Sequence, residues 1–132
     1  MNDLSNKPIE TLNVLTGQIV DAAFQVHQQL GAGLLESVYE KCLKWEIQQK
    51  GLQVESQYKV PIFYKNQDMG SDLKIDLFIE NTIIVEIKSL ENLLPIHKAQ
   101  LITYLKLTHK KVGLLINFNV PLIRAGISRI IL

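Results

Sequence analysis

Cysteine is almost absent from this sequence, and its scarcity excludes several classes of protein. Cys42 is the single cysteine, so neither an intrachain disulfide nor a cysteine-based zinc site can form. Apolar stretches such as Thr82–Val85 are far shorter than the roughly 18 residues that a membrane span needs. The amino-terminal segment has no basic region followed by an apolar run, which is the pattern of a secretory signal. We therefore expect a cytoplasmic protein with no membrane partner.

The sequence also has no low-complexity run, no internal repeat and no linker rich in proline and serine. Its 132 residues, of which 47% are hydrophobic and 20% charged, suit one folded domain with a single substantial core. We expect one domain over residues 1–132, with residues 1–8 flexible.

The net charge of +1 conceals an uneven distribution. Residues 1–87 carry seven Lys and Arg against twelve Asp and Glu, whereas residues 88–132 carry seven Lys and Arg and only Glu91. A basic carboxyl-terminal third suits an anionic partner such as nucleic acid. The alternative is a solvated basic face that folds back near the acidic part, and charge alone leaves both open.

Apolar periodicity and turn residues predict the order of elements. Helices are expected at residues 9–30, 35–50 and 94–108, and strands at 53–64, within a hairpin at 74–89, at 112–117 and, as an edge strand, at 129–132. Residues 66–71 are expected to form a turn. The order ααβββαβ, with this carboxyl-terminal edge strand as an addition, predicts an α/β or α+β fold with a mixed central sheet flanked by helices.

The hairpin KIDLFIENTIIVEIKS, residues 74–89, has charges inside the most strand-like part of the chain. Side chains alternate along a strand, so six apolar residues are expected to share the core side: Ile75, Leu77, Ile79, Ile83, Val85 and Ile87. A three-residue loop at 80–82 pairs Ile79 with Ile83 and places Asp76 opposite Glu86. A two-residue turn would instead put a row of carboxylates against the core.

Opposed carboxylates destabilise a strand pair by up to ~1 kcal/mol, and Lys88 alone cannot neutralise two acids. A divalent cation can, because Mg²⁺ is held by one or two carboxylates together with water and phosphate oxygens. The alternative is an exposed sheet face that carries a Glu–Lys pair of little energetic value. The residues of the hairpin alone leave both interpretations open.

Asp76 followed by Glu86-Ile87-Lys88 resembles the metal site of the PD-(D/E)XK nuclease superfamily, with Ile75 where proline is usual. Residues 100–104, QLITY, are similar to the Q-x-x-x-Y motif of its RecB-like branch. Residues 33–39, GLLESVY, resemble the signature of the small GxxExxY proteins of this superfamily. The resemblance extends over nearly the whole chain from about residue 16, through Val26-His27, Leu30-Gly31, Leu94–His97 and Gly113–Phe118.

The resemblance implies a restriction-endonuclease-like core with the metal site at one end of the sheet. It implies that Asp76 and Glu86 hold Mg²⁺ or Mn²⁺, assisted by the Ile87 carbonyl, and that Lys88 positions or stabilises the attacking hydroxide. Glu36 would complete the metal shell directly or through water. His27 resembles a helix histidine that is a metal ligand in RecB-like relatives.

Gln100 and Tyr104 lie four residues apart on a helix, so they can face the same ligand. His97 at the start of that helix can contact phosphate or cap the helix. Glu36 is also favourable at a helix start through the macrodipole alone, and His27 can be a hydrogen-bonded structural residue.

The function implied is metal-dependent hydrolysis of phosphodiester bonds, in DNA rather than RNA. The alternative is a non-catalytic module that keeps the nuclease fold and binds nucleic acid or a protein. A homodimer or a partner protein is a further option that the sequence leaves open.

Overall fold

The computed structural model describes residues 3–132 and arranges three α-helices around a five-stranded sheet in that range. The elements are α1 (Ile9–Leu30), α2 (Glu36–Gln49), β1 (Val54–Val60), β2 (Phe63–Tyr64), β3 (Gln67–Asp68), β4 (Leu73–Ile79), β5 (Ile83–Lys88), α3 (Pro95–Thr108), β6 (Val112–Asn117), the 3₁₀ helix η1 (Ile123–Gly126) and β7 (Ile127–Ile131). None of the helices in this range is both long and apolar enough to cross a membrane.

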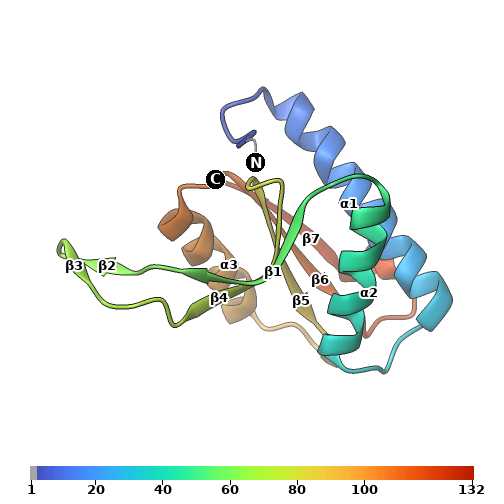
Figure 1. Cartoon of the computed structure of the whole chain (residues 1–132). Helices are drawn as coiled ribbons and strands as arrows, with labels where there is room; N and C mark the ends of the chain where they lie inside the picture. Colours follow the sequence, from blue (N-terminus) through green and yellow to red (C-terminus); the bar gives the residue numbers. More distant parts are fainter. Residues whose placement is uncertain (1–2) are drawn as a thin grey trace.

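The central sheet is mixed, as predicted. Its strand order is β1-β4-β5-β6-β7, with β5 and β6 parallel and every other neighbouring pair antiparallel. Helices α1 and α2 lie on one face and α3 on the other (Figure 1). The expected edge strand at the carboxyl terminus is β7, which pairs with β6. The predicted α+β fold with helices around a mixed sheet is confirmed.

Each face of the sheet is covered by its own hydrophobic core. The larger core joins the sheet to α1 and α2, and the smaller one joins it to α3 through Leu101, Tyr104 and Leu105. Strand β5 is buried from Ile83 to Ile87 because helices cover both of its faces. The sequence pattern predicts that only one side of the hairpin faces a core, whereas β5 packs against a core on each of its two faces.

The alternation of side chains changes phase where β4 reaches Asp76. Leu77 packs in the core under α2, whereas Ile75, two residues earlier, packs in the core under α3. The prediction that Ile75 shares the face of Leu77 is wrong. The strand β1 changes side at the facing positions, Ser56, Gln57 and Tyr58. Gln57 has a φ of 51°, a left-handed conformation that L-residues seldom adopt, and this irregular backbone allows the change of phase.

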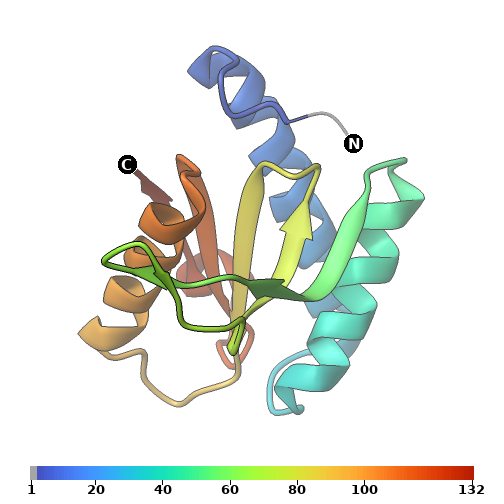
Figure 2. The ribbon, with the colours of Figure 1, turned by 60° about the vertical axis from the view of Figure 1, so that its left-hand side comes forward.

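Beyond this point β1 and β4 continue into a two-stranded ribbon, β2–β3, which extends from the body of the protein in Figure 1 and crosses in front of α3 in the view of Figure 2. The predicted single strand over 53–64 is interrupted because β1 ends at Val60, just before Pro61. The turn lies at Lys65 and Asn66, whose φ values of 48° and 63° suit a tight hairpin. Residues 67–68 are a strand rather than part of the expected turn.

Residues 3–8, which were expected to be flexible, make specific contacts with the fold. The Leu4 N–H donates to Thr82 Oγ1 at 2.9 Å, and Asp3 forms an ion pair with Lys110 at 2.6 Å. Leu4 also packs against the larger core. Residues 1–2 of the segment expected to be flexible lie outside the described residues.

Candidate functional site

The β4–β5 hairpin has the register that the apolar pattern predicts. Ile79 pairs with Ile83, and Leu77 pairs with Val85, so residues 80–82 form the three-residue loop. The next position in the same register places Asp76 beside Glu86. The backbone ladder between β4 and β5 ends before this position, and the next main-chain N–H groups donate to side-chain carboxylates.

The carboxylates of Asp76 and Glu86 accept main-chain hydrogen bonds across the hairpin. The Asp76 N–H donates to Glu86 Oε2 at 2.9 Å, and the Ile87 N–H donates to Asp76 Oδ2 at 2.8 Å. Each carboxylate therefore reaches the backbone of the opposite strand. This exchange holds both acids at the same end of the hairpin.

Glu86 is the most deeply buried of these acids, with 5% of its surface exposed. Burial and then the negative charge of Asp76 raise the pKa of Glu86 to about 8, while the hydrogen bond from the Asp76 N–H and the charge of Lys88 act in the opposite direction. The ion pairs among residues 3–132 join Lys50 to Asp21 and Lys110 to Asp3, so neither involves Glu86. The site thus pairs a buried carboxylate, Glu86, with the half-buried Asp76, without a full counter-charge.

Asp76 also borders a hollow of about 690 Å³ at the amino-terminal end of α2. Glu36, the first residue of α2, lines it, and Glu36 Oε1 accepts the Ser89 N–H at 3.4 Å. Ser89 Oγ donates to the Leu34 carbonyl at 2.6 Å, which ties the segment after β5 to the start of α2. The structure thus brings Glu36 to the hollow that Asp76 and Ile87 also line.

Two residues of this hollow were missed by the sequence interpretation. Gln57 Nε2 donates to Glu40 Oε1 at 2.6 Å and to Asp76 Oδ1 at 3.2 Å, so it bridges the two acids. Burial raises the pKa of Glu40, a hydrogen bond from Gln57 opposes this rise, and the Asp76 charge adds to it. Glu40 follows Glu36 by four residues, and this helical spacing could have identified it. No sequence signal identifies Gln57.

Helix α3 brings one of its three candidate residues to the carboxylates. Tyr104 is buried, and its pKa is raised by burial and then by the charges of Glu86 and Asp76. Gln100 lies exposed one turn earlier. His97 caps the helix, because its Nδ1 accepts the Leu94 N–H at 2.9 Å.

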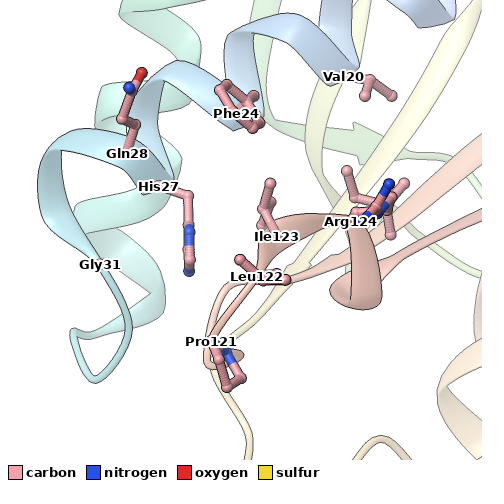
Figure 3. A pocket seen from close by; sticks show the side chains of 10 residues that line it. Val20, Phe24, His27, Gln28, Gly31, Pro121, Leu122, Ile123 and Arg124 are labelled. Carbon is pink, nitrogen blue, oxygen red and sulfur yellow. The ribbon is translucent and has the colours of Figure 1, made fainter.

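His27 is not brought together with the carboxylates. It points from α1 toward the loop that precedes η1, where its Nε2 is 2.8 Å from the Val120 carbonyl and acts as the donor (Figure 3). It lines a separate, largely apolar cavity of about 840 Å³ that shares no lining residue with the hollow at Asp76. The structure thus gives His27 a main-chain partner outside the hollow, and metal ligation by His27 stays a prediction without support from this geometry.

Asn117 is a further residue that the sequence interpretation did not assign. It is buried and pairs with Lys88 in the parallel β5–β6 ladder. Its Oδ1 accepts the Leu90 N–H at 3.0 Å, and its Nδ2 donates to the Leu90 carbonyl at 2.9 Å. Asn117 therefore fixes the segment that follows Lys88, and a lone amide at the end of an apolar strand was the available signal.

The donor atoms at the hairpin suit a hard divalent cation that keeps part of its water shell. Asp76 and Glu86 supply carboxylates, and the Ile87 carbonyl points to the same side of β5 as the Ile87 N–H, which donates to Asp76. Mg²⁺ is held in this way by one or two carboxylates. No group of three or more His, Cys, Asp and Glu side chains within residues 3–132 is arranged to hold a metal ion. The residues therefore fit a sparsely ligated Mg²⁺ or Mn²⁺ and not a cage made entirely of protein side chains.

In a comparison with known protein families, residues 13–130 match the PD-(D/E)XK nuclease superfamily. The match includes β4, β5, α2 and α3, and thus every residue around the hollow described above. No curated protein and no solved structure matches the chain.

Proposed function

Because this chain belongs to the PD-(D/E)XK nuclease superfamily, we propose that it is a metal-dependent nuclease that hydrolyses phosphodiester bonds, with DNA as its substrate. The observation that carries the proposal is the Asp76–Glu86 pair. Glu86 is buried and Asp76 half-buried, each carboxylate accepts a main-chain N–H of the opposite strand, and neither acid forms an ion pair within residues 3–132. Such a pair is costly unless a bound cation compensates it.

In this proposal Asp76, Glu86 and the Ile87 carbonyl hold Mg²⁺ or Mn²⁺, and Glu36 completes the site directly or through water. A divalent ion, when bound, supplies positive charge at the scissile phosphate and makes water a better nucleophile at neutral pH. Lys88 positions the attacking water and stabilises its hydroxide form. Gln57 orients the Asp76 carboxylate through the bond to Oδ1.

Tyr104 and Gln100 are proposed to bind the substrate strand from α3. Tyr104 lies close enough to Glu86 for that charge to raise its pKa, so its hydroxyl stays protonated and can donate to a phosphate oxygen. Gln100, one helical turn away, offers an amide at the exposed side of the site. His97 is held as a cap and is assigned no substrate contact.

We further assign the chain to the small GxxExxY group, on the segment between α1 and the first turns of α2. Gly33 has a φ of 95°, which favours glycine. Tyr39 Oη donates to the Gly31 carbonyl at 2.6 Å and accepts the Leu34 N–H at 3.1 Å. The glycine and the tyrosine thus support the turn that presents Glu36 to the hollow.

Cleavage of labelled nucleic acids tests the proposal. Single-stranded and duplex DNA and RNA are incubated with the protein in Mg²⁺, in Mn²⁺ and in EDTA. We expect cleavage that requires the metal and that Asp76→Asn abolishes, because asparagine keeps the hydrogen bond from Ile87 and removes the charge. Glu10→Gln, which neutralises an exposed acid in the first turn of α1, is the control and should cut normally. Equal cleavage by Asp76→Asn and wild type would reject the site.

The alternative function is a non-catalytic module that binds nucleic acid or a protein on the same fold. The observation that favours it is the lack of a three-ligand group among the described residues 3–132. Wild-type protein that binds nucleic acid but cuts none of the four substrates in either metal would establish this alternative.

A further inference from the structure

Two lysines face each other across β1 and β4 just beyond the site. Lys59 and Lys74 are partners in the antiparallel register, and both are exposed. Neither side chain makes an ion pair or hydrogen bond to any residue in the range 3–132. Like charges directly opposite each other destabilise a sheet, so this pair favours an anion between or above the two ammonium groups.

The lysine pair lies on the same side of the ladder as the acid site. Tyr58 and Ile75, the pair next to the lysines, pack in the core under α3, so the lysines point to the opposite side. Asp76 meets Glu40 of α2 through Gln57 on that opposite side. With a rise of about 3.3 Å per residue, the Cα atom of Lys74 lies roughly 7 Å from that of Asp76. A strand with one phosphate at Asp76 can therefore place its next phosphates over the lysines.

An aromatic side chain lies farther along the same extension. Tyr64 in β2 is 59% exposed, and the Lys65 ammonium lies 5.4 Å from the centre of its ring. Phe63 lines a cavity with Phe78 and other residues on the α3 side. Because neighbouring strand residues point to opposite faces, Tyr64 points away from that cavity. Figure 1 shows the ribbon that carries it extending from the body of the protein.

We propose that residues 59–74, the arm, bind a single-stranded segment of nucleic acid on one side of the scissile phosphate. Lys59 and Lys74 hold phosphates, and Tyr64 stacks on an unpaired base beside the Lys65 charge. Stacking on aromatic side chains is a mode of recognition for unpaired bases, whereas bases in a duplex are already stacked on their neighbours. The position of the scissile phosphate in this inference depends on the proposed function.

The charge of the arm supports a nucleic-acid strand over an acidic protein segment. Lys59, Lys65 and Lys74 occupy both its base and its tip, so the positive charges follow its length. The arm also contains two acids, so its lysines exceed its acids by one charge. Asp68 is engaged within the ribbon, because its Oδ1 accepts the Gly70 N–H at 2.8 Å, and Asp72 is exposed. A line of separated lysines that ends in an exposed tyrosine matches a backbone with repeated phosphates and a flat base.

Fluorescence anisotropy with a labelled 20-nucleotide single strand and a duplex of equal length tests the arm, in EDTA so that no metal-dependent cleavage occurs. Lys59→Gln/Lys74→Gln is expected to weaken single-strand binding about tenfold and to reduce the slope of log affinity against log salt by about 1.4, which corresponds to two phosphate contacts. Tyr64→Ala is expected to weaken single-strand binding at least about fivefold and to leave duplex binding unchanged. The matched control is Lys7→Gln/Lys111→Gln, which removes the same charge from exposed lysines elsewhere.

The binding role of the arm would be rejected if the control pair weakened single-strand binding as much as the arm variants do. It would also be rejected if the wild type did not bind a single strand. Cleavage measured in parallel separates the two proposals. If the arm variants bind and cut like the wild type, the proposed binding role of the arm is rejected and the proposed nuclease activity is unaffected. If the wild type binds a single strand through the arm but cuts no substrate, the binding role of the arm is supported and the nuclease activity is rejected. The three arm side chains are exposed, so the melting temperature should not fall, and removal of the lysine repulsion should raise it slightly.

Discussion

At both ends of the β4–β5 hairpin, side-chain oxygens accept hydrogen bonds from main-chain N–H groups, but a neutral hydroxyl does so at one end and carboxylates do so at the other. At the turn, Ile79 and Ile83 pair in a regular ladder, and buried Thr82 donates to the Glu80 carbonyl at 2.6 Å while accepting the Leu4 N–H at 2.9 Å. At the other end, carboxylates accept the main-chain N–H groups of Asp76 and Ile87. The turn end is neutral and closed, whereas the far end concentrates negative charge.

The two ends differ in how many hydrogen-bond acceptor positions of their side chains remain unoccupied. A carboxylate has about four acceptor positions, and each bond from an N–H occupies only one of them. Asp76 and Glu86 are therefore fixed in orientation by the hairpin and still have oxygen lone pairs for a cation. The hydroxyl of Thr82, in contrast, is occupied both as donor and as acceptor. The turn end stabilises the fold. The carboxylate end destabilises it, and a bound cation would offset that destabilisation.

The largest effect is expected from neutralising the buried acid at the open end. The pKa of Glu86 in the folded protein, about 8, lies above its ordinary value of 4.5. The contribution of protonated Glu86 to stability is thus complete below pH 4.5 and is lost as the pH rises through about 8. Above that pH the loss is on the order of 5 kcal/mol. Glu86→Gln, which cannot ionise, should escape it.

Urea unfolding in EDTA at pH values from 4.5 to 9 measures this effect. We expect the free energy of unfolding of Glu86→Gln to exceed that of the wild type increasingly toward pH 9, while the variant loses cleavage. Glu40→Gln is the comparison variant, because the pKa of Glu40 is also raised but this acid is less buried. A constant difference between Glu86→Gln and wild type across this range would show that Glu86 ionises normally.

The next largest effect concerns the lysine at the open end. Lys88→Met is expected to lower the cleavage rate by about a hundredfold or more, because positioned groups that assist proton transfer contribute this much. The metal-induced rise in melting temperature should persist, since the carboxylates remain. Lys41→Met, an exposed lysine on α2, is the matched control and should cut normally. Loss of the metal response in Lys88→Met would instead assign the lysine to the integrity of the site.

A smaller effect is expected at the closed end. Thr82→Val removes the two hydrogen bonds of a buried hydroxyl and leaves the Leu4 N–H without its partner. We expect a loss of about 1–3 kcal/mol in the free energy of unfolding, measured with urea. Exposed Thr11→Val is the control. Cleavage per folded molecule should be unchanged, and a selective loss of cleavage would remove the distinction between the two ends.

The smallest effect is expected at the irregular position opposite Asp76. Gln57 has a φ of 51°, so Gln57→Gly should be more stable than Gln57→Ala by about 1 kcal/mol, although both lose the bridge to Glu40 and Asp76. Thermal unfolding of the two variants provides the comparison. If alanine were as stable as glycine, the left-handed backbone at this position would not be needed for the change of phase.

The sequence was a good guide wherever the signal was periodic. Helix α1 and strand β6 have the predicted bounds, and the apolar pattern selected the correct hairpin register, because a shift of one residue would have buried a row of carboxylates. The position of Ile75 and the separate ribbon were missed. Both depend on local backbone conformations, at Gln57 and at Pro61, that strand alternation does not anticipate.

The site was predictable only in part, for a similar reason. The register predicts Asp76 and Glu86 as neighbours, and the structure places them together, with Tyr104 near enough to respond to their charges; their roles stay a prediction. The contact of His27 with Val120 was not foreseen, because Val120 lies 93 residues away in the chain and its position is set by packing. Motif spacing indicates which residues share an element, and it does not indicate which long-range partner each one meets.

The response of the melting temperature to metal tests the central claim most directly. A ligand bound only by the folded state adds RT ln(1 + [L]/Kd), or ~2.7 kcal/mol at a hundredfold excess over Kd. Adding Mg²⁺ or Mn²⁺ should therefore raise the melting temperature of the wild type and of Glu10→Gln, and Asp76→Asn should lose most of that rise. Identical responses of wild type and Asp76→Asn would contradict a metal site at the open end of the hairpin.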